Sequence, residues 1–302
     1  MEKFALDLTI LMPAYNEEAV IPEVISRIED VMSMLDFKYE ILVVDDGSDD
    51  QTTESARAAG ARVVRHPENI GNGAAIKTGI RNAKGKTLLM MDADGQHPPE
   101  VIPELLENVK SYDMVVASRT KQSETSFHRD IANRIYNRLA SYITGKKIED
   151  LTSGFRAINT EVVRGFVYLL PNTFSYPTTI TLALLRSGRS LLYIPFESKK
   201  RVGKSKIKLI RDGLRFLLII LRISTYYSPL KVFIPISLMM FILGFGYGLF
   251  KVIFLGLPYG PTSAMLMTVS VVIFLVGLVS EQVAQLRYQW SEGSRENVIL
   301  NE

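Results

Sequence analysis

Two long uncharged segments near the C-terminus constrain this chain more than any other feature. Val232–Phe250 and Pro261–Ser280 contain no charged residue, and only residues 251–260 separate them. Because a helix rises about 1.5 Å per residue, roughly 20 apolar residues cross a hydrocarbon core of about 30 Å. We therefore predict a transmembrane hairpin of two helices over residues 231–285. A pair of buried core helices is the alternative, which the spanning length of both runs disfavours.

A basic segment precedes the first apolar run. Residues 199–231 contain ten lysines and arginines and one acidic residue, Asp212. Basic residues beside a membrane span mark its cytoplasmic side and favour an anionic membrane surface. We predict a basic amphipathic interfacial helix region over 204–230 and a cytoplasmic tail over 286–302. A nucleic-acid patch is the rival interpretation, and the adjoining spans argue against it.

The N-terminal two thirds of the chain predict a cytoplasmic α/β domain over residues 1–203. No apolar signal segment occurs within residues 1–10, and the absence of cysteine excludes disulfides and thiol chemistry. Short apolar strands alternate with helices, which is typical of a mostly parallel sheet covered on both faces. The predicted strands are 8–12, 41–44, 62–65, 87–91 and 114–117, and the predicted helices are 17–35, 51–59, 72–83 and 99–110.

Three of these strands end in polar residues, and ligands of parallel sheets gather at the carboxyl ends of the strands. The three ends are Pro13–Glu17, Asp45-Asp46 and Asp92-Ala93-Asp94. Two carboxylates one residue apart suit a hard divalent cation, with Gln96 as a third oxygen donor. An ordinary capped turn is the alternative for each acidic pair.

Other chemistries find little support. Gly71-Asn72-Gly73 lacks the third glycine of a dinucleotide fingerprint, because Ile76 occupies that position. No serine–histidine–acid or zinc-ligand spacing occurs, and His97 is interpreted as a cover for its loop rather than a ligand.

A set of motifs in a fixed order resembles a known family. The motifs are PAYNEE (13–18), VVDDGSDD (43–50), NIGNGAAIKTGI (69–80), MDADGQHPPE (91–100), SR (118–119) and DLTSGFRAIN (150–159). The set resembles family-two glycosyltransferases, and more narrowly the polyprenyl-phosphate hexosyltransferases of the dolichol-phosphate mannose synthase group. This resemblance implies a glycosyltransferase-A fold with a Rossmann-like, mostly parallel sheet, followed by interfacial and transmembrane helices.

The resemblance also implies roles for individual residues. The nucleotide would lie against Pro13, Ala14, Tyr15, Glu17, Val44, Asp46, Lys77, Asp92 and Ala93. Of these, Asp46 would contact the nucleobase. Mg²⁺ or Mn²⁺ would be held by Asp92, Asp94 and Gln96. The catalytic residues would be Asp94, Arg119, Arg134 and Arg201, and the acceptor phosphate would meet Arg119, Arg129, Arg134, Arg201 and Lys206. Relatives often carry lysine where this chain has Asn72, so a phosphate contact there or at Lys77 stays open.

The implied reaction is inverting transfer of a hexose from a UDP- or GDP-sugar to a membrane polyprenyl phosphate, dolichyl or undecaprenyl. The partners implied are the nucleotide sugar, the lipid phosphate and the membrane, without nucleic acid; a homo-oligomer is an open expectation. A processive polysaccharide synthase is one alternative. Those enzymes resemble one another in a Gln-x-x-Arg-Trp motif that precedes further membrane spans, whereas the only tryptophan of this chain, Trp290, lies after the last span. A catalytically silent sugar-nucleotide or lipid-binding protein is the other. The sequence identifies neither the sugar nor the base.

Overall fold

The computed structural model describes residues 4–120, 127–172, 175–197 and 228–299, with 218, 221–222 and 224–225 between them. Side chains are described for the same residues except 127–133 and 287–299. The chain divides into two compact units, Met1–Ile219 and Ile220–Glu302, and each is described by itself.

The first unit is built on one seven-stranded sheet. Its strand order is β3-β2-β1-β4-β6-β5-β7, and of these strands only β6 runs antiparallel to its neighbours. The strands are β1 (Leu6–Ala14), β2 (Tyr39–Asp45), β3 (Arg62–Arg65), β4 (Gly85–Met90), β5 (Met114–Arg119), β6 (Arg156–Asn159) and β7 (Leu191–Phe196). The predicted mostly parallel α/β sheet is thus confirmed.

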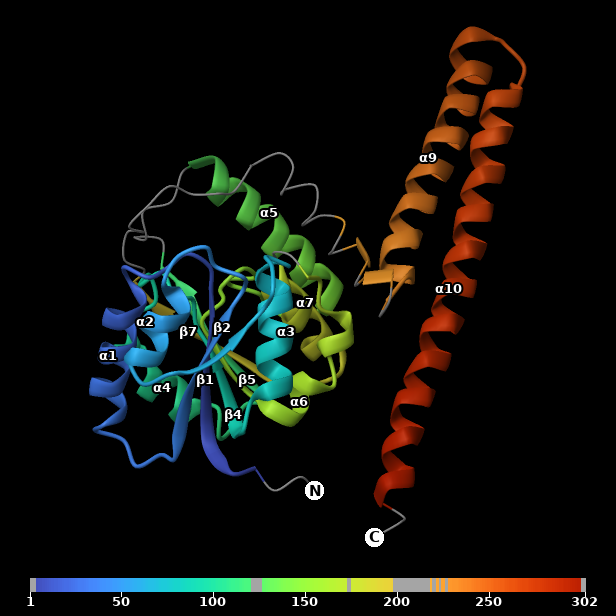
Figure 1. The fold of residues 1–302 in the computed structure, drawn as a ribbon. Helices are drawn as coiled ribbons and strands as arrows, with labels where there is room; N and C mark the ends of the chain where they lie inside the picture. Colours follow the sequence, from blue (N-terminus) through green and yellow to red (C-terminus); the bar gives the residue numbers. More distant parts are fainter. Residues whose placement is uncertain are drawn as a thin grey trace. The chain divides into compact units, whose positions relative to one another are not determined.

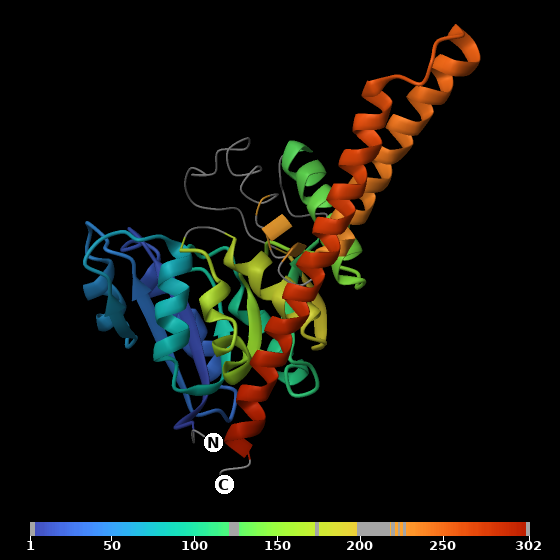
Figure 2. The ribbon, with the colours of Figure 1, turned by 90° about the vertical axis from the view of Figure 1, so that its right-hand side faces the viewer.

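Helices cover both faces of this sheet (Figures 1 and 2). They are α1 (Ile21–Met32), α2 (Thr52–Ala58), α3 (Asn72–Asn82), η1 (Pro99–Val101), α4 (Ile102–Asn108), α5 (Phe127–Thr144), α6 (Thr160–Arg164), η2 (Val167–Leu169) and α7 (Tyr176–Arg186). Burial on both faces explains why the central strands read as continuous apolar runs instead of alternating ones.

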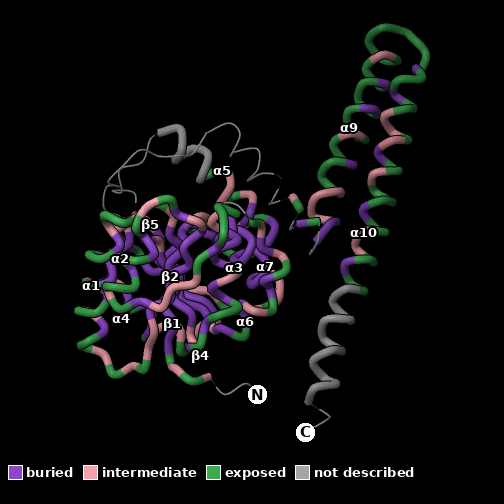
Figure 3. The backbone as a smooth tube through the Cα atoms, viewed as in Figure 1, coloured by how far each residue is buried: buried purple, intermediate pink, exposed green. Residues whose placement is uncertain are grey.

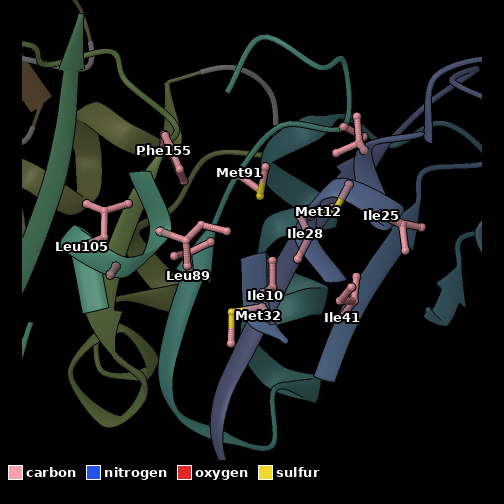
Figure 4. Close-up of a cluster of buried hydrophobic side chains, with 14 of the residues drawn as sticks. Ile10, Met12, Ile25, Ile28, Met32, Ile41, Leu89, Met91, Leu105 and Phe155 are labelled. Carbon is pink, nitrogen blue, oxygen red and sulfur yellow. The ribbon is translucent and has the colours of Figure 1, made fainter. Parts of the chain in front are cut away.

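Each face has its own apolar layer. Alternate strand residues such as Ile10, Met12 and Leu89 pack with Ile25 and Ile28 of α1 in one buried cluster, which Figure 4 shows in close-up. On the opposite face α3 approaches β1 so closely that a Cβ at Gly79 would lie 2.1 Å from the Leu11 side chain. The sheet is therefore a rigid platform at whose carboxyl edge loops can be held in place.

That edge is where the parallel strands end and where β6 begins. Ala14 pairs with Asp45 at the ends of β1 and β2, and Arg156, the first residue of β6, pairs with Met90, the last of β4. The antiparallel direction of β6 brings residues 150–155 to the same edge as the loops that follow β1, β2, β4 and β5.

The second unit is a helical hairpin of α9 (Leu230–Leu255) and α10 (Pro261–Ile299). Leu230–Leu255 and Pro261–Leu286 are long and apolar enough to cross a membrane, and most of their large side chains are exposed (Figure 3). The buried residues of α9 are small: Ser237, Gly244 and Gly248. A Cβ at Gly244 would lie 2.8 Å from the Leu266 Cβ, so glycine permits the close approach of the two helices.

The predicted two-helix hairpin is present, with α9 and α10 containing the two uncharged runs. At its base the backbone N–H of Leu230 donates to the Glu281 carboxylate at 3.3 Å. Most of the predicted interfacial helix region over 204–230 lies outside the described residues. The domain boundaries at 203 and 285 stay predictions.

Candidate active site

The loop after β4 carries the acidic pair Asp92 and Asp94. Gly95 turns the backbone with φ +73°, a conformation that favours glycine, and the N–H of Gln96 donates to Asp94 Oδ1 at 3.2 Å. The Asp92 side chain is 35% exposed, and Gln96 is half-buried. The loop therefore presents two carboxylates and an amide at the edge of the sheet, at partly solvated positions.

His97 is a buried side chain that fixes the backbone of this loop. The backbone N–H of Asp92 donates to His97 Nδ1 at 3.0 Å, and the imidazole stacks on Phe155 with ring centres 5.0 Å apart. Burial is the main reason that the pKa of His97 falls to about 4, so the ring is neutral at physiological pH. Its buried position agrees with a covering role.

The acidic turn after β2 is built differently. The Asp45 carboxylate is fully buried and accepts from the Ser48 N–H at 2.9 Å, from the Ser48 hydroxyl at 2.6 Å and from the Thr53 hydroxyl. Asp46 accepts from Ile70 N–H at 3.1 Å and Gly71 N–H at 2.7 Å. Both carboxylates therefore stabilise the turn itself.

Asp46 also joins two loops through a histidine. His66 Nδ1 lies 2.7 Å from Asp46 Oδ1, and His66 Nε2 lies 2.8 Å from the Thr78 hydroxyl. Gly47 has φ +72°, and a Cβ there would lie 2.4 Å from the Glu68 carbonyl carbon. The 46–48 turn and the 66–71 loop are consequently locked together, and a contact of Asp46 with a base stays a prediction.

The predicted nucleotide-binding residues mostly meet at neighbouring strand ends. Backbone N–H groups of Asn16 and Glu17 donate to the Ser48 and Thr52 hydroxyls at 3.0 and 2.9 Å, which fixes the loop after β1 against the turn after β2. This arrangement brings together Pro13, Ala14, Tyr15, Glu17, Val44 and Asp46. Ala14, Val44 and Ala93 are buried, so their side chains offer little surface to a ligand.

Lys77 lies on α3 and has internal partners. Its ammonium group donates to the Leu170 carbonyl at 3.3 Å and to the Asn172 side chain. Burial and the nearby Arg81 lower the pKa of Lys77. The Asn72 side-chain oxygen is buried and has no hydrogen-bond partner among the described residues. A phosphate contact of either residue stays a prediction.

Arg119, the last residue of β5, forms a bidentate ion pair with Asp150. Nε and one terminal nitrogen lie 2.9 and 3.1 Å from the two Asp150 oxygens, and the same terminal nitrogen donates to Thr152 Oγ1 at 2.5 Å. Burial raises the pKa of Asp150, but the charge and hydrogen bonds of Arg119 and the donors of Thr152 outweigh it and lower the pKa overall. The guanidinium plane of Arg119 is thereby oriented.

The remaining predicted cations are only partly described. Arg134 is exposed on α5. The side chain of Arg129, together with Arg201 and Lys206, lies outside the described residues. The roles of all four stay predictions.

Sequence reasoning assigned no role to Asp150 or Arg156, although both lie in the DLTSGFRAIN motif. Arg156 is fully buried at the start of β6, and Asp150 aligns Arg119 from 31 residues away. An arginine inside the apolar strand pattern of residues 155–158 was the available signal for Arg156.

The donors at the β4 loop suit a hard divalent cation. Asp92, Asp94 and Gln96 offer oxygen ligands. No group of three or more His, Cys, Asp or Glu side chains that could hold a metal ion occurs among the described residues. Mg²⁺ and Mn²⁺ commonly take one or two carboxylates and complete their shell with substrate phosphates and water. The residues present therefore fit a cation that arrives with a phosphate ligand.

Comparisons with known proteins agree with this geometry. The family model described as Glycosyl transferase family 2 matches residues 9–166, and the GtrB C-terminal hairpin model matches residues 228–286. An undecaprenyl-phosphate 4-deoxy-4-formamido-L-arabinose transferase of Klebsiella pneumoniae is 31% identical over 84% of this chain and 78% of the relative. A dolichol-phosphate mannosyltransferase of Pyrococcus furiosus is 34% identical over 67% of this chain and 60% of that protein.

A solved structure shares the fold. Glucosyl-3-phosphoglycerate synthase from Mycobacterium tuberculosis superposes with a TM-score of 0.58 at 21% identity, over 73% of this chain and 80% of that one. The first unit thus has a glycosyltransferase-A-like fold. The chain belongs to glycosyl transferase family 2 and is a glycosyltransferase.

Proposed function

We propose that this glycosyltransferase moves a hexose from a UDP- or GDP-sugar to a polyprenyl phosphate in the membrane, with inversion at the anomeric carbon. The observation that carries the proposal is the pairing, in one chain, of a half-buried acidic loop at the sheet edge with two helices of spanning length. The two relatives named above are polyprenyl-phosphate sugar transferases by name, which supports the same acceptor class.

Asp92, Asp94 and Gln96 would hold Mg²⁺ or Mn²⁺ on the diphosphate. Such a cation, when bound, stabilises the charge that builds on the leaving diphosphate as a Lewis acid. One neighbour of the same fold was crystallised with Mn²⁺ and UDP, in keeping with this donor set. His97 holds the backbone of Asp92 from its buried side, and so fixes where the first carboxylate lies.

Arg119 would hold the acceptor phosphate. A phosphate monoester has a second pKa near ~6 and is mostly dianionic at neutral pH, so it needs orientation and charge neutralisation more than a general base. The Asp150 pair fixes the guanidinium plane of Arg119 at the end of β5. Arg134 on α5, with Arg129, Arg201 and Lys206, would supply further positive charge. A single displacement by this oxyanion inverts the anomeric carbon.

We further propose that the protein is an integral membrane protein whose catalytic domain, residues 1–203, and both termini are cytoplasmic. Support comes from the hairpin match over residues 228–286 and from the basic residues that precede it. An acceptor whose polyprenyl tail stays in the bilayer requires a site that the membrane can reach. The hairpin provides that anchorage.

The test is incorporation of labelled sugar into organic-soluble lipid by the purified full chain in detergent. The panel pairs UDP- and GDP-hexoses with dolichyl or undecaprenyl phosphate and Mg²⁺ or Mn²⁺. One nucleotide sugar is expected to yield a sugar lipid of inverted configuration by NMR, and EDTA is expected to stop the reaction. Failure of every pair in the panel would refute the proposal.

A separate prediction concerns the acceptor side. Arg134→Ala is expected to raise the apparent KM for polyprenyl phosphate about tenfold, because one phosphate cation is lost. The KM for the nucleotide sugar should change less than twofold. Arg138→Ala, four residues along the same helix, is the control. Equal effects on both substrates would contradict an acceptor role for Arg134.

A further inference from the structure

Arg156 is a buried cation for which the proposed reaction has no use. It opens β6 in the middle of the sheet, between β4 and β5, and its side chain is 0% exposed. One terminal nitrogen donates to the Pro177 carbonyl and the Thr181 hydroxyl, both at 3.1 Å, and the other donates to the Ser153 carbonyl. The first of these nitrogens also lies 3.8 Å from Met114 Sδ, and all four partners are neutral.

No carboxylate among the described residues forms an ion pair with Arg156, and its Nε has no hydrogen-bond partner there. The hydroxyl of Tyr176 is likewise buried and has no hydrogen-bond partner among the described residues. An arginine stays protonated in proteins, and burying its charge without an ion pair is costly. Its retention here calls for negative charge at longer range.

The charges of Asp150 and then Asp92 oppose the fall that burial causes in the pKa of Arg156, and of the two Asp92 belongs to the proposed cation site. Ser153, whose carbonyl accepts from Arg156, precedes Gly154 in the chain. Asp92 and the Tyr176 hydroxyl both border the space beside Gly154: a Cβ there would lie 2.9 Å from the hydroxyl and 3.4 and 3.5 Å from the carboxylate oxygens. Burial first, and then the Asp92 charge, raises the pKa of Tyr176. Gly154 keeps this space open.

We propose that Arg156 is a buried positioning residue that offsets the negative charge gathered at Asp92 and on a bound nucleoside diphosphate. In this proposal the Arg156 guanidinium contacts neither the Asp92 carboxylate nor the diphosphate. It acts through the low dielectric of the interior, where charges interact more strongly than in water. This inference rests on the proposed function and names the diphosphate as the group that the buried charge serves.

The test compares Arg156→Met with wild type in the full chain, by calorimetric titration with UDP and GDP in the presence of Mn²⁺, and with uridine and guanosine. Methionine fills similar volume without charge, and such replacements of buried ionic groups are often neutral or stabilising. We expect about tenfold weaker binding of the diphosphate that wild type prefers. We expect less than twofold change for its nucleoside and an unchanged or higher unfolding temperature.

Arg164→Met is the matched control. Arg164 ends α6 and donates to the Ala83 carbonyl at 2.9 Å, beside the opposite edge of the sheet where β4 begins, so the variant removes the same charge away from the site. Its diphosphate affinity should equal that of wild type. Arg156→Lys should restore part of the lost affinity, since lysine keeps a positive charge.

Unchanged diphosphate affinity in Arg156→Met would overturn the inference while leaving the proposed function intact. If wild type binds neither UDP nor GDP, the proposed function fails and the inference fails with it. Should Arg156→Met not fold, Arg156→Gln decides instead, because glutamine removes the charge while its amide N–H groups can still donate to nearby carbonyls. That variant is expected to bind the diphosphate about tenfold more weakly, and wild-type affinity would overturn the inference.

Discussion

Two acidic turns follow parallel strands of the same sheet, and the structure treats them in opposite ways. The Asp45 and Asp46 side chains are 0% and 4% exposed, and internal donors surround both carboxylates. The Asp92 side chain is 35% exposed, and the loop that carries it is held mainly through its backbone and His97. In sequence both turns are aspartates at a strand end. Their burial and their hydrogen-bond donors separate a structural turn from one whose carboxylates face solvent.

The two turns differ in how much their carboxylates contribute to the stability of the fold at this edge of the sheet. The 45–48 turn stabilises the fold, because removing a buried acceptor leaves several donors without a partner. The 92–96 loop keeps carboxylates partly in water, where a cation can reach them. Four changes test this division.

The largest expected effect is on activity. Asp94→Ala should lower sugar transfer roughly a thousandfold, because the cation that stabilises the leaving diphosphate loses a carboxylate ligand worth several kcal/mol. The unfolding temperature and membrane association should stay those of wild type. Transfer at a normal rate by this variant would remove Asp94 from the cation site.

The second change should act on stability. Asp46→Ala is expected to lower the free energy of unfolding by about 3 kcal/mol, since His66 and two backbone N–H groups lose their acceptor inside the protein. Chemical denaturation in detergent measures this loss. Asp49→Ala, at an exposed position of the same turn, is the control and should change the free energy by less than 0.5 kcal/mol or so. A stable Asp46→Ala protein would break the comparison.

The third change sharpens the description of the space beside Asp92. Gly154→Ala should lower the rate of transfer about tenfold, because the new methyl group presses on the Tyr176 hydroxyl at 2.9 Å and touches the Asp92 carboxylate. Tyr176→Phe added to Gly154→Ala relieves the closest contact and should recover part of the rate. No loss of rate in the single variant would show that this space is not needed.

The smallest expected effect is the pH dependence of the Arg119–Asp150 pair. The folded-state pKa of Asp150 is lowered, so its stabilisation is present above the unfolded value near ~3.9 and is lost as pH falls below it. The stability difference between wild type and Asp150→Asn should therefore be largest at neutral pH and should shrink below about pH 4. Unfolding midpoints at pH 7 and at about pH 2.5 measure it, with Glu149→Gln as the exposed neighbour for background. A pH-independent difference would contradict the ion pair as its source.

Much of the sheet could be predicted because its parallel strands are short apolar runs. The expected strand over 62–65 matches β3, and the expected strands over 41–44 and 114–117 lie inside β2 and β5. The expected helix over 17–35 is longer than α1, Ile21–Met32, because a turn over residues 18–20 precedes the helix and Ser33 follows its end. Local patterns thus identified the elements better than their ends.

The site was harder to predict, because its contacts join residues far apart in the chain. Nothing local to Asp150 indicates that Arg119 will lie 2.9 Å away, and nothing local to Asp46 indicates His66. The resemblance grouped the motifs correctly but gave no partner to either acid. The structure supplies those pairings.

The antiparallel β6 has a consequence for how this protein can diversify. The loops that follow β1, β2 and β4 leave the sheet at this edge, whereas residues 150–155 approach the same edge as they lead into β6. The chain between β5 and β6 can therefore change in length or composition while the threading of β1 to β4 stays the same. A change of acceptor would then require changes only in the segment between β5 and β6. The strands proposed to bind the sugar nucleotide would stay the same.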